Sequence, residues 1–481
     1  MSIQSAWQLV FGSHGQKPIV VEASQAQLSS DAGLLPIRQF DEQIGLTRQF
    51  AEALVDTRDP AFCLHSRLSM VRQRVYGILA DYEDQNDHNT LRSDPVFKLL
   101  ADRSPDEEDL ASQPTLSRFE NAVTIPDLYR LRDFLVTQFL ESFDAPPVRL
   151  TLDFDAFDDP THGQQQLTFF HGYYDQYQYF PLVVTCAEND QVLLVGLRHG
   201  TCAAWLGADD DLRSLVERLR AVWPDVEIHI RADSGFGVPA MYDVCEELKL
   251  TYTFGIGMNA RLKRISDELL AQAVTQYEQT SRPQRLFLGT WYQADSWDHE
   301  RYVVVKAEAH ARGTNRRAVV TNRPGAPILP QATYDEYTER GESENRNKEL
   351  KEGLSADRLS DHRFLANFFR LYLHAASLNL LVRLRRAVAK HLTPRQLGMN
   401  DPLPAETLAG SRRRTYFNRR RDNDPLGEGH PCTWRTRLIK VAAEVLVSSR
   451  RVLVRLSSSW PHLDHFTAVS RTILSLAPDT G

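Results

Sequence analysis

The sequence lacks the features of a membrane or secreted protein. It has no apolar run as long as the roughly 18 residues that a membrane-spanning helix needs. Its first residues, MSIQSAWQLVFGSHGQKP, lack the basic-then-apolar pattern of a secretory signal. The five cysteines are scattered and form no CxxC pair, which argues against a disulfide framework or a zinc site; they are Cys63, Cys186, Cys202, Cys245 and Cys432. We therefore expect a cytoplasmic protein with reduced thiols and no membrane partner.

Two phosphate-binding signatures are also absent. No GxGxxG follows a predicted strand, and no GxxxxGK[ST] loop occurs. The sequence has no internal repeat and no long low-complexity tract. These absences leave little support for a nucleotide-dependent metabolic enzyme.

Charge is distributed unevenly along the 481 residues, whose formal net charge is −7. Residues 381–460 carry 17 Lys and Arg against 6 Asp and Glu, a local balance of +11 that leaves −18 for the rest of the chain. A basic region on an acidic chain is typical of a surface that binds a polyanion. An arginine-rich solvated helix would give the same pattern, and charge alone does not separate the two.

Residues 1–145 are predicted to be mainly helical, because apolar residues recur at helical spacing in 67–83. The stretch SQPTLSRFENAV (112–123) predicts a short helix that is capped by Thr115 and carries Arg118. It is similar to the start of a DNA-reading helix, although an ordinary surface helix is the alternative. The pair Pro146-Pro147 predicts a boundary.

Residues 148–257 predict an α/β unit. VRLTLDFDAF (148–157) alternates strictly and places Asp153 and Asp155 on the same face of a strand. Two strand-like runs joined by END predict a hairpin, and two helices alternate with two more strands after it. The predicted order is β-β-β-α-β-α-β, over the segments 148–157, 179–187, 191–199, 210–223, 225–236, 239–250 and 251–257.

The remaining segments are less regular. Strand-like runs at 285–293 and 301–308 interrupt the unit, and one long helix from about 333 to 353 is expected to complete it. Residues 362–390 are strongly helical. Residues 438–456 predict either a helix followed by a strand or a single helix.

The stretch YTERGESENRNKELK (337–351) places Tyr337, Arg340, Glu344 and Lys351 along one stripe of the expected helix. Taken alone, an exposed charged helix with ion pairs explains the pattern equally well. Asp155 and Asp233, however, are expected at the ends of strands, and the carboxyl ends of strands are where sites form in open α/β sheets.

Three converging carboxylates repel one another unless they bind cations, and ligands that are all oxygen suit Mg²⁺ or Mn²⁺. Two such ions can activate a water or a 3′-hydroxyl and stabilise the leaving oxygen in phosphoryl transfer. We therefore expect Asp155, Asp233 and Glu344 to be metal ligands, with two Mg²⁺ ions as the cofactor. Tyr337, Arg340 and Lys351 would then meet the phosphodiester.

The spacing Tyr-x₂-Arg-x₃-Glu-x₆-Lys matches the Y-R-E-K signature of bacterial insertion-sequence DDE transposases, which the sequence resembles. The stretches that carry the resemblance cover nearly the whole chain: QRVYGILADYEDQNDH (73–88), LDFDAFDDPTHGQQQLTFFHGYYDQYQYFPLV (152–183), RADSGFG (231–237) and SSRRVLVRLSSSWP (448–461). The resemblance implies a ribonuclease-H-like catalytic core in 146–258 and 331–390, with a β-rich insertion at 259–330. It also implies a helical DNA-binding region at 1–145 and a basic, mostly helical DNA-binding or dimerisation region at 391–481.

Carried over by position, the family's catalytic triad falls on Asp155, Asp233 and Glu344. The family has a threonine two residues after the first aspartate, but Phe157 stands there, so a role for that hydroxyl is in doubt. Alternation cannot separate Asp153 from Asp155 as the first ligand, and the resemblance favours Asp155. In related proteins a tryptophan of the insertion stacks on a displaced base, which makes Trp291 and Trp297 candidates beside the alternative that each packs in a core.

Two aromatic-containing stretches lead to different expectations. HGYYDQYQYF (171–180) is expected to pack against the edge of the sheet rather than to stack on nucleotides. SRRRTYFNRRR (411–421) places arginine runs on both sides of Tyr416 and Phe417 and is expected to contact the DNA backbone. Its candidate contacts are Arg412, Arg413, Arg414, Arg419 and Arg420.

The resemblance implies a cut-and-paste transposase of the bacterial cytoplasm that acts at the nucleoid. Such an enzyme binds terminal inverted repeats, cleaves both ends of the element and joins the 3′-hydroxyls to target DNA. Because two ends must be joined, we expect a homodimer on DNA. Two alternatives remain open at this stage: a nuclease of the same fold without strand transfer, and a domesticated transposase that binds DNA without catalysis. The use of a hairpin intermediate is also left open.

Overall fold

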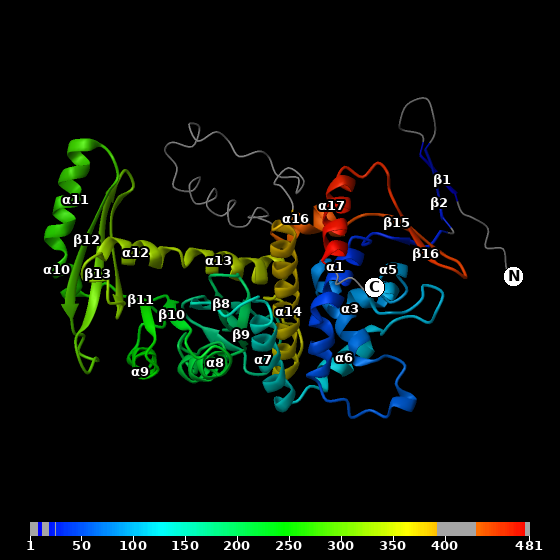
Figure 1. Ribbon diagram of the computed structural model, residues 1–481, viewed down its shortest axis with the longest axis horizontal. Helices are drawn as coiled ribbons and strands as arrows, with labels where there is room; N and C mark the ends of the chain where they lie inside the picture. Colours follow the sequence, from blue (N-terminus) through cyan, green and yellow to red (C-terminus); the bar gives the residue numbers. More distant parts are fainter. Residues whose placement is uncertain (1–7, 12–18, 25, 392–429, 477–481) are drawn as a thin grey trace.

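The computed structural model describes residues 8–11, 19–24, 26–391 and 430–476. One long helix, α14, stands between a part built on a large sheet and a part built of shorter helices (Figure 1). The C-terminal elements lie on the helical side, where β15 pairs with β3 of the N-terminal region. Two parts of the chain that are distant in sequence therefore share one core.

The N-terminal helices surround α14 because their apolar faces meet there. The long helix, Phe364–Ala389, is buried along most of its length and contacts α3, α6 and α7. Helix α6 begins after Ser112, so Thr115 lies inside its first turn rather than at its cap. The elements before the large sheet are β1 Gln8–Phe11, β2 Ile19–Glu22, β3 Leu28–Ser29, α1 Leu34–Ile44, α2 Leu46–Glu52, α3 Arg67–Leu79, α4 His88–Leu91, α5 Pro95–Leu100, α6 Gln113–Asn121 and α7 Ile125–Leu140, with 3₁₀ turns Pro60–Phe62 and Gln85–Asp87.

The large sheet is mixed and has the order β12-β13-β14-β11-β10-β4-β8-β9. Strand β4 runs parallel to β10, and β10 runs parallel to β11. The predicted series of strands and helices is confirmed: β4 Arg149–Ala156, β8 Leu182–Cys186, β9 Val192–Gly196, α8 Ala208–Val222, β10 Glu227–Ala232, α9 Pro239–Glu247 and β11 Thr251–Ile256. The apolar face of β4, with Leu150, Leu152 and Phe154, is fully buried, as alternation predicts.

A small sheet, not predicted, is inserted between β4 and β8. Its order is β5-β7-β6, with β5 Asp159–Pro160, β6 Phe169–His171 and β7 Gln176–Tyr179. Strands β6 and β7 pair antiparallel as a hairpin. This hairpin begins close in sequence to Asp155.

The segment 259–330 continues the large sheet instead of forming a separate one. Strand β14 pairs antiparallel with β11, and β13 and β12 follow outward. Two helices precede these strands, so the segment is not purely β. Its elements are α10 Ala260–Ile265, α11 Asp267–Thr280, β12 Gln284–Tyr292, β13 Arg301–His310 and β14 Gly313–Thr321.

The expected single helix at 333–353 is wrong. The chain forms α12 Pro330–Thr338 and α13 Gly341–Lys348, followed by a π-helical turn at Glu349–Gly353. Gly341 has low helix propensity, and the break falls directly before it. The two helices lie in line between the outer strands and α14 (Figure 1).

Residues 438–456 match neither predicted alternative in full, because helix is limited to the end of a π-helical turn and two strands follow it. After α16 Pro431–Trp434 and a π-helical turn Arg435–Ile439, strands β15 Ala443–Val447 and β16 Val452–Leu456 form a hairpin. The turn residues SSRR separate two runs rich in valine and leucine, which suits a hairpin. Helix α17, Leu463–Ser475, ends the described chain. No helix among the described residues is both long and apolar enough to cross a bilayer.

Candidate active site

Two of the predicted carboxylates lie at the same end of neighbouring parallel strands. Phe154 of β4 is paired with Ala232 of β10, so the next residues, Asp155 near the end of β4 and Asp233 directly after β10, lie side by side. The side chain of Asp233 is held by its own loop, since its Oδ1 accepts a hydrogen bond of 2.8 Å from the backbone N–H of Gly235. The sheet therefore fixes the spacing of this pair of carboxylates.

The third carboxylate reaches this edge through an arginine. The Nη1 of Arg340 lies 3.4 Å from Asp155 Oδ2, and its Nη2 donates to Glu344 Oε1 at 2.7 Å. Arg340 is largely buried, whereas more than half of the Glu344 side chain is exposed. One guanidinium thus bridges the first and third residues of the predicted triad.

Tyr337 reaches the same place because Gly255 lacks a side chain. A Cβ at Gly255 of β11 would lie 2.8 Å from the Tyr337 hydroxyl and 3.0 Å from the backbone nitrogen of Ser234. The hydroxyl therefore rests over the end of β11, beside the loop that carries Asp233. The structure thus brings together five of the predicted residues: Tyr337, Arg340, Glu344, Asp155 and Asp233.

Burial and like charges act together on Asp155. Burial raises the pKa of this carboxyl to about 6; Asp233 and Glu344 add to the rise, and Arg340 opposes it. Burial alone would lower the pKa of Arg340, but Asp155, Tyr337 and Glu344 raise it above its ordinary value. Burial also raises the pKa of the Tyr337 hydroxyl. The site concentrates negative charge around one guanidinium.

Asp153, the alternative first ligand, is engaged elsewhere. Both of its oxygens accept hydrogen bonds from Arg231, at 2.7 and 2.8 Å, and the pair is almost fully buried. Arg231 also donates to the backbone oxygen of Glu336, at the end of α12. Asp153 therefore helps to hold the helix that carries Tyr337.

Lys351 does not continue the stripe toward the triad. It lies in the π-helical turn, and its Nζ donates to Asp158 Oδ1 at 2.8 Å. Asn347, which sequence reasoning missed, donates from Nδ2 to Asp155 Oδ2 at 2.9 Å. Its position three residues after Glu344, on the same side of the helix, was the signal that could have identified it. Phe157, at the place of the family's threonine, is buried in the core.

The predicted DNA-contacting residues outside this edge lie in several places. Arg118 is exposed on α6, which packs on α14. Trp291 on β12 is 59% exposed, whereas Trp297 is 8% exposed and packs edge-on against Tyr242 and Tyr292. The five candidate arginines of 411–421 lie outside the described residues.

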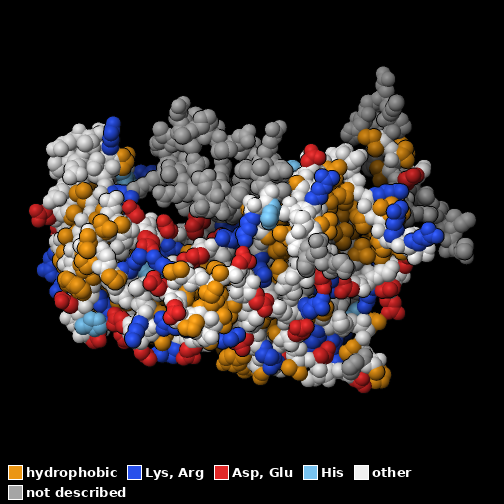
Figure 2. Space-filling view, in the orientation of Figure 1, with side chains coloured by type: hydrophobic (Ala, Val, Ile, Leu, Met, Phe, Trp, Pro, Cys, Tyr) orange, Lys and Arg blue, Asp and Glu red, His pale blue; other side chains and the backbone are white. Residues whose placement is uncertain are grey.

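Charge on the described surface is mixed on the face drawn in Figure 2, where acidic and basic side chains are interspersed. The described part of the basic segment, residues 381–460, includes Arg450, Arg451 and Arg455, which are exposed on the β15–β16 hairpin. These three residues extend the basic segment onto the helical side of the molecule.

Of the aromatic residues in HGYYDQYQYF, only the last two pack on the sheet as predicted. Tyr179 and Phe180 are buried against the sheet. Tyr173, Tyr174 and Tyr177 are exposed, as are Phe169 and Phe170 just before the stretch. These five side chains project from the β6–β7 hairpin rather than packing on the sheet edge.

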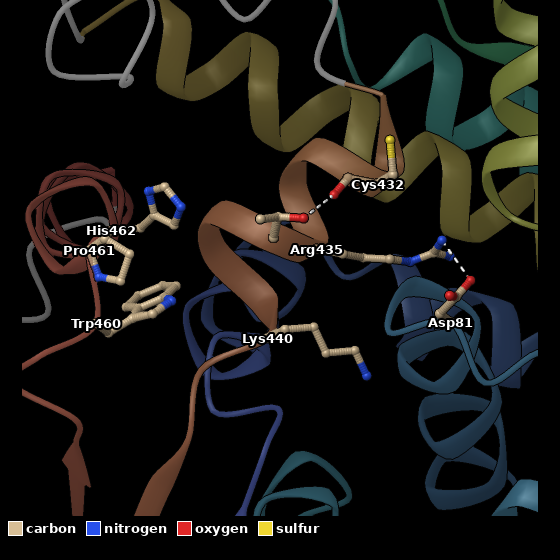
Figure 3. Close-up of a pocket in the computed structure, with 8 residues that line it drawn as sticks. Asp81, Cys432, Arg435, Lys440, Trp460, Pro461 and His462 are labelled. Carbon is tan, nitrogen blue, oxygen red and sulfur yellow. Dashed lines mark hydrogen bonds and ion pairs between the residues drawn. The ribbon is translucent and has the colours of Figure 1, made fainter. Parts of the chain in front are cut away.

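A separate hollow of about 490 Å³ lies between the end of α3, α16 and the loop before α17 (Figure 3). Trp460, Pro461 and His462 line one side of it. Its cations are already paired, Arg435 with Asp81 and Lys440 with Asp31, each at 2.7 Å. None of its lining residues belongs to the predicted site.

The three predicted carboxylates do not form a closed metal site in the described geometry. No group of three or more His, Cys, Asp or Glu side chains in the described segments is arranged to hold an ion. Glu344 is directed toward Arg340, which explains why the three carboxylates do not close on one point. The donor chemistry nevertheless fits Mg²⁺, because the nearby ligands are oxygens. Asn347 Oδ1, beside Asp155, is also buried without a hydrogen-bond partner.

Comparison with known proteins gives three findings. A search of curated proteins finds no match. Among solved structures, a piggyBac transposase synaptic complex with hairpin DNA, determined by cryo-electron microscopy, is similar at a TM-score of 0.39 and 13% identity, over 75% of this chain and 77% of that chain. Residues 11–399 match the family described as transposase DDE domain group 1. That match spans most of the chain and includes every residue of the site at the ends of β4 and β10, and the protein therefore belongs to the DDE transposase family.

Proposed function

We propose that the protein is a cut-and-paste DNA transposase that binds terminal inverted repeats, cleaves the element's ends and joins the 3′-hydroxyls to target DNA. The observation that carries the proposal is the placement of Asp155 and Asp233 at the ends of adjacent parallel strands, with Arg340 joining Asp155 to Glu344. The strand order β9-β8-β4-β10-β11, with one acid near the end of β4 and one directly after β10, supports a ribonuclease-H-like core.

Asp155, Asp233 and Glu344 would hold two Mg²⁺ ions, with Mn²⁺ as a substitute. Bound there, the ions would polarise the scissile phosphodiester and favour ionisation of the attacking water or hydroxyl. Glu344 is exposed enough to exchange Arg340 for another partner. Asn347 fixes the orientation of Asp155 through its amide, so the carboxylate at the end of β4 is positioned before substrate arrives.

The basic residues of the stripe would meet the substrate backbone. Arg340 presents two N–H groups at the carboxylate edge, and a guanidinium is suited to pairing with phosphate oxygens. Lys351 would place a second positive charge at Asp158, three residues after Asp155, where its Nζ now donates to the Asp158 carboxylate. The Tyr337 hydroxyl would donate a hydrogen bond to the same backbone. These residues bind and orient the phosphodiester beside Asp155 and Asp233.

DNA outside the cleavage point would contact Arg118, Trp291 and the basic segment 381–460. Arg118 and Trp291 are exposed, so both can contact a ligand without local unfolding. Two ends of the element must be held for joining, and we therefore propose that the protein acts as a homodimer on DNA.

The test is a reaction with DNA that carries the element's flanking repeats, with and without Mg²⁺, analysed on a denaturing gel. We expect metal-dependent nicks at the repeat ends and, in the same reaction, strand-transfer products. Nicks without joined products would indicate a nuclease instead. Binding without any nick, unchanged by Asp155→Ala, would indicate a non-catalytic DNA-binding protein.

A further inference from the structure

The β6–β7 hairpin exposes a cluster of aromatic rings. Tyr173 at its tip is 86% exposed, and Tyr174, Tyr177, Phe169 and Phe170 are exposed to lesser degrees. Single exposed rings are ordinary, but five within nine residues form an apolar patch of the kind that marks a binding surface. The folding of the hairpin does not explain this exposure, because the rings cover no core.

The hairpin is fixed to the active-site edge by a shared carboxylate. Gln176 of β7 donates to Asp158 Oδ2 at 3.2 Å, and Lys351 donates to Asp158 Oδ1 at 2.8 Å. Asp158 follows Asp155 by only three residues, so its position relative to the triad is limited by the chain itself. The tip of the hairpin is also ordered, since the backbone N–H groups of Tyr174 and Asp175 both donate to His171 O.

The two faces of the β6–β7 hairpin contact different side chains. Because successive side chains of a strand point to opposite faces, Gln176 faces Asp158 and Tyr177 faces away from it. Tyr177 instead pairs edge-on with Phe170, ring centroids 5.6 Å apart. Tyr174 belongs to the other group of rings, 5.0 Å from both His171 and Tyr173. The Tyr174 ring also lies 6.2 Å, centroid to centroid, from Phe180, two residues before β8, and β8 pairs with β4 at Asp155.

The side chains at the tip of the β6–β7 hairpin indicate which kind of ligand suits it. Between Phe169 and Gln178 there is no lysine or arginine, and Asp175 adds a negative charge, so the tip does not suit a phosphate. An uncharged planar surface suits it better, because bases stack on aromatic rings whatever their sequence. Bases in a duplex are already stacked on their neighbours, whereas an unpaired base beside a cleavage point is open to such a contact.

We propose that Tyr173 and Tyr174, at the tip of the β6–β7 hairpin, stack on unpaired bases of the DNA strand held at Asp155 and Asp233. The inference rests on the proposed function and deepens it, since it adds a base-binding subsite to an edge that otherwise contacts only the backbone. The subsite accepts any base, so it selects for unpaired structure at the cut end and not for a sequence.

The test uses the full-length chain, EDTA to prevent cleavage, and two probes. One probe is a DNA duplex with a short unpaired segment that contains 2-aminopurine, and the other is the same duplex fully paired. Wild-type protein should bind the unpaired probe more tightly and quench its fluorescence. Tyr173→Ala and Tyr174→Ala should each weaken that binding about 10-fold, the effect expected for one lost stacking contact, and leave the paired probe unchanged. Tyr173→Phe and Tyr174→Phe keep the ring and should retain both binding and quenching.

Tyr177→Ala is the matched control, since it removes a tyrosine from the same hairpin but from the opposite face. Tyr177→Ala should leave the binding of both probes unchanged. Equal binding of the two probes by wild type, equal losses on both probes in the tip variants, or the same loss in Tyr177→Ala would each overturn the inference. Because Tyr173 is almost fully exposed, Tyr173→Ala should leave thermal unfolding unchanged, which excludes misfolding as the cause of a loss.

Parallel reactions with Mg²⁺ separate this inference from the proposed function. Metal-dependent nicking by wild type, with no difference between the tip variants and wild type on the unpaired probe, would refute the subsite alone. No nicking and no DNA binding by wild type would refute the function as well.

Discussion

Asp153 and Arg231 form a buried ion pair with two parallel hydrogen bonds, of 2.7 and 2.8 Å, across strands β4 and β10. Asp153 lies two residues before Asp155, on the same face of β4. Through Arg231 it also holds the backbone of Glu336, one residue before Tyr337. A structural carboxylate and a proposed catalytic one therefore stand next to each other on β4.

This arrangement predicts opposite effects for two similar substitutions. Asp153→Ala leaves the buried guanidinium of Arg231 without its partner, and we expect a loss of about 3–5 kcal/mol in the free energy of unfolding. Asp155→Ala removes a carboxylate that is crowded by Asp233 and Glu344, so stability should be unchanged or higher while cleavage is lost. Urea unfolding and the gel assay measure the two properties. Equal destabilisation by both substitutions would contradict the assignment.

The sequence predicted the strand but not which aspartate is free. Alternation places Asp153 and Asp155 on one face, as the structure confirms, and says nothing of their partners. The partner of Asp153 lies 78 residues away and depends on the parallel register of β4 and β10. Long-range pairing of this kind leaves no local pattern, so only the resemblance favoured Asp155 before the structure was known.

Metal binding should depend on all three acids of the proposed triad. Asp155→Ala, Asp233→Ala and Glu344→Ala should each abolish cleavage and weaken Mn²⁺ binding, measured by electron paramagnetic resonance of the free ion, while binding of repeat DNA is kept. Glu352→Ala is the control, because Glu352 is an exposed carboxylate shortly after Lys351. If Glu344→Ala still joined DNA ends in Mg²⁺, the triad would be misassigned.

The structure brings together three of the four stripe residues of 337–351, although the single helix expected there is broken. Tyr337, Arg340 and Glu344 meet at one edge. Residues three and four positions apart stay on the same side of the chain despite the break before Gly341. Lys351 lies in the π-helical turn that follows α13, and its side chain donates to Asp158 instead. Helical spacing is reliable over one or two turns, and an irregular turn removes its value beyond them.

The buried carboxyl of Asp159 is expected to make the free energy of unfolding depend on pH. Both of its carboxylate oxygens are buried without a hydrogen-bond partner, and burial raises its pKa well above the ordinary value; Asp357 and Asp158 add to the rise, and Lys351 opposes it. Because the folded state binds this proton more tightly than the unfolded state, the Asp159 carboxyl does not oppose folding at low pH. As pH rises above about 4, the carboxyl ionises in the unfolded state first, and the free energy of unfolding falls.

Asp159→Asn should therefore raise the free energy of unfolding at pH 7 by about 1–3 kcal/mol and have a smaller effect near pH 4. The measurement is thermal unfolding of both proteins across this pH range, so that the titration of all other groups cancels. A gain that is larger at pH 4 than at pH 7 would contradict the predicted sign.

The two tryptophans of the outer strands should behave differently. Trp297 is buried among Tyr242, Tyr292 and the guanidinium of Arg301, and Trp297→Ala should cost about 3–5 kcal/mol of stability. Trp291→Ala removes an exposed ring and should change stability by about 0.5 kcal/mol or less, while cleavage of repeat DNA falls. Unfolding midpoints and cleavage rates of the two variants test this, and an unstable Trp291→Ala protein would argue against a role in DNA contact.

Gly255 should be required for the position of Tyr337. A Cβ at this position would approach the Tyr337 hydroxyl to 2.8 Å, so Gly255→Ala should displace that group and lower cleavage roughly 10-fold or more, with a stability loss of about 1–3 kcal/mol. Gly257→Ala is the matched control, because nothing lies within 4 Å of its added Cβ. Tyr337→Phe removes the oxygen that the added methyl group would meet, but the contact with the Ser234 backbone nitrogen remains, so the double variant should recover part of the stability and no cleavage. Full activity in Gly255→Ala would show that the Tyr337 hydroxyl does not need this position.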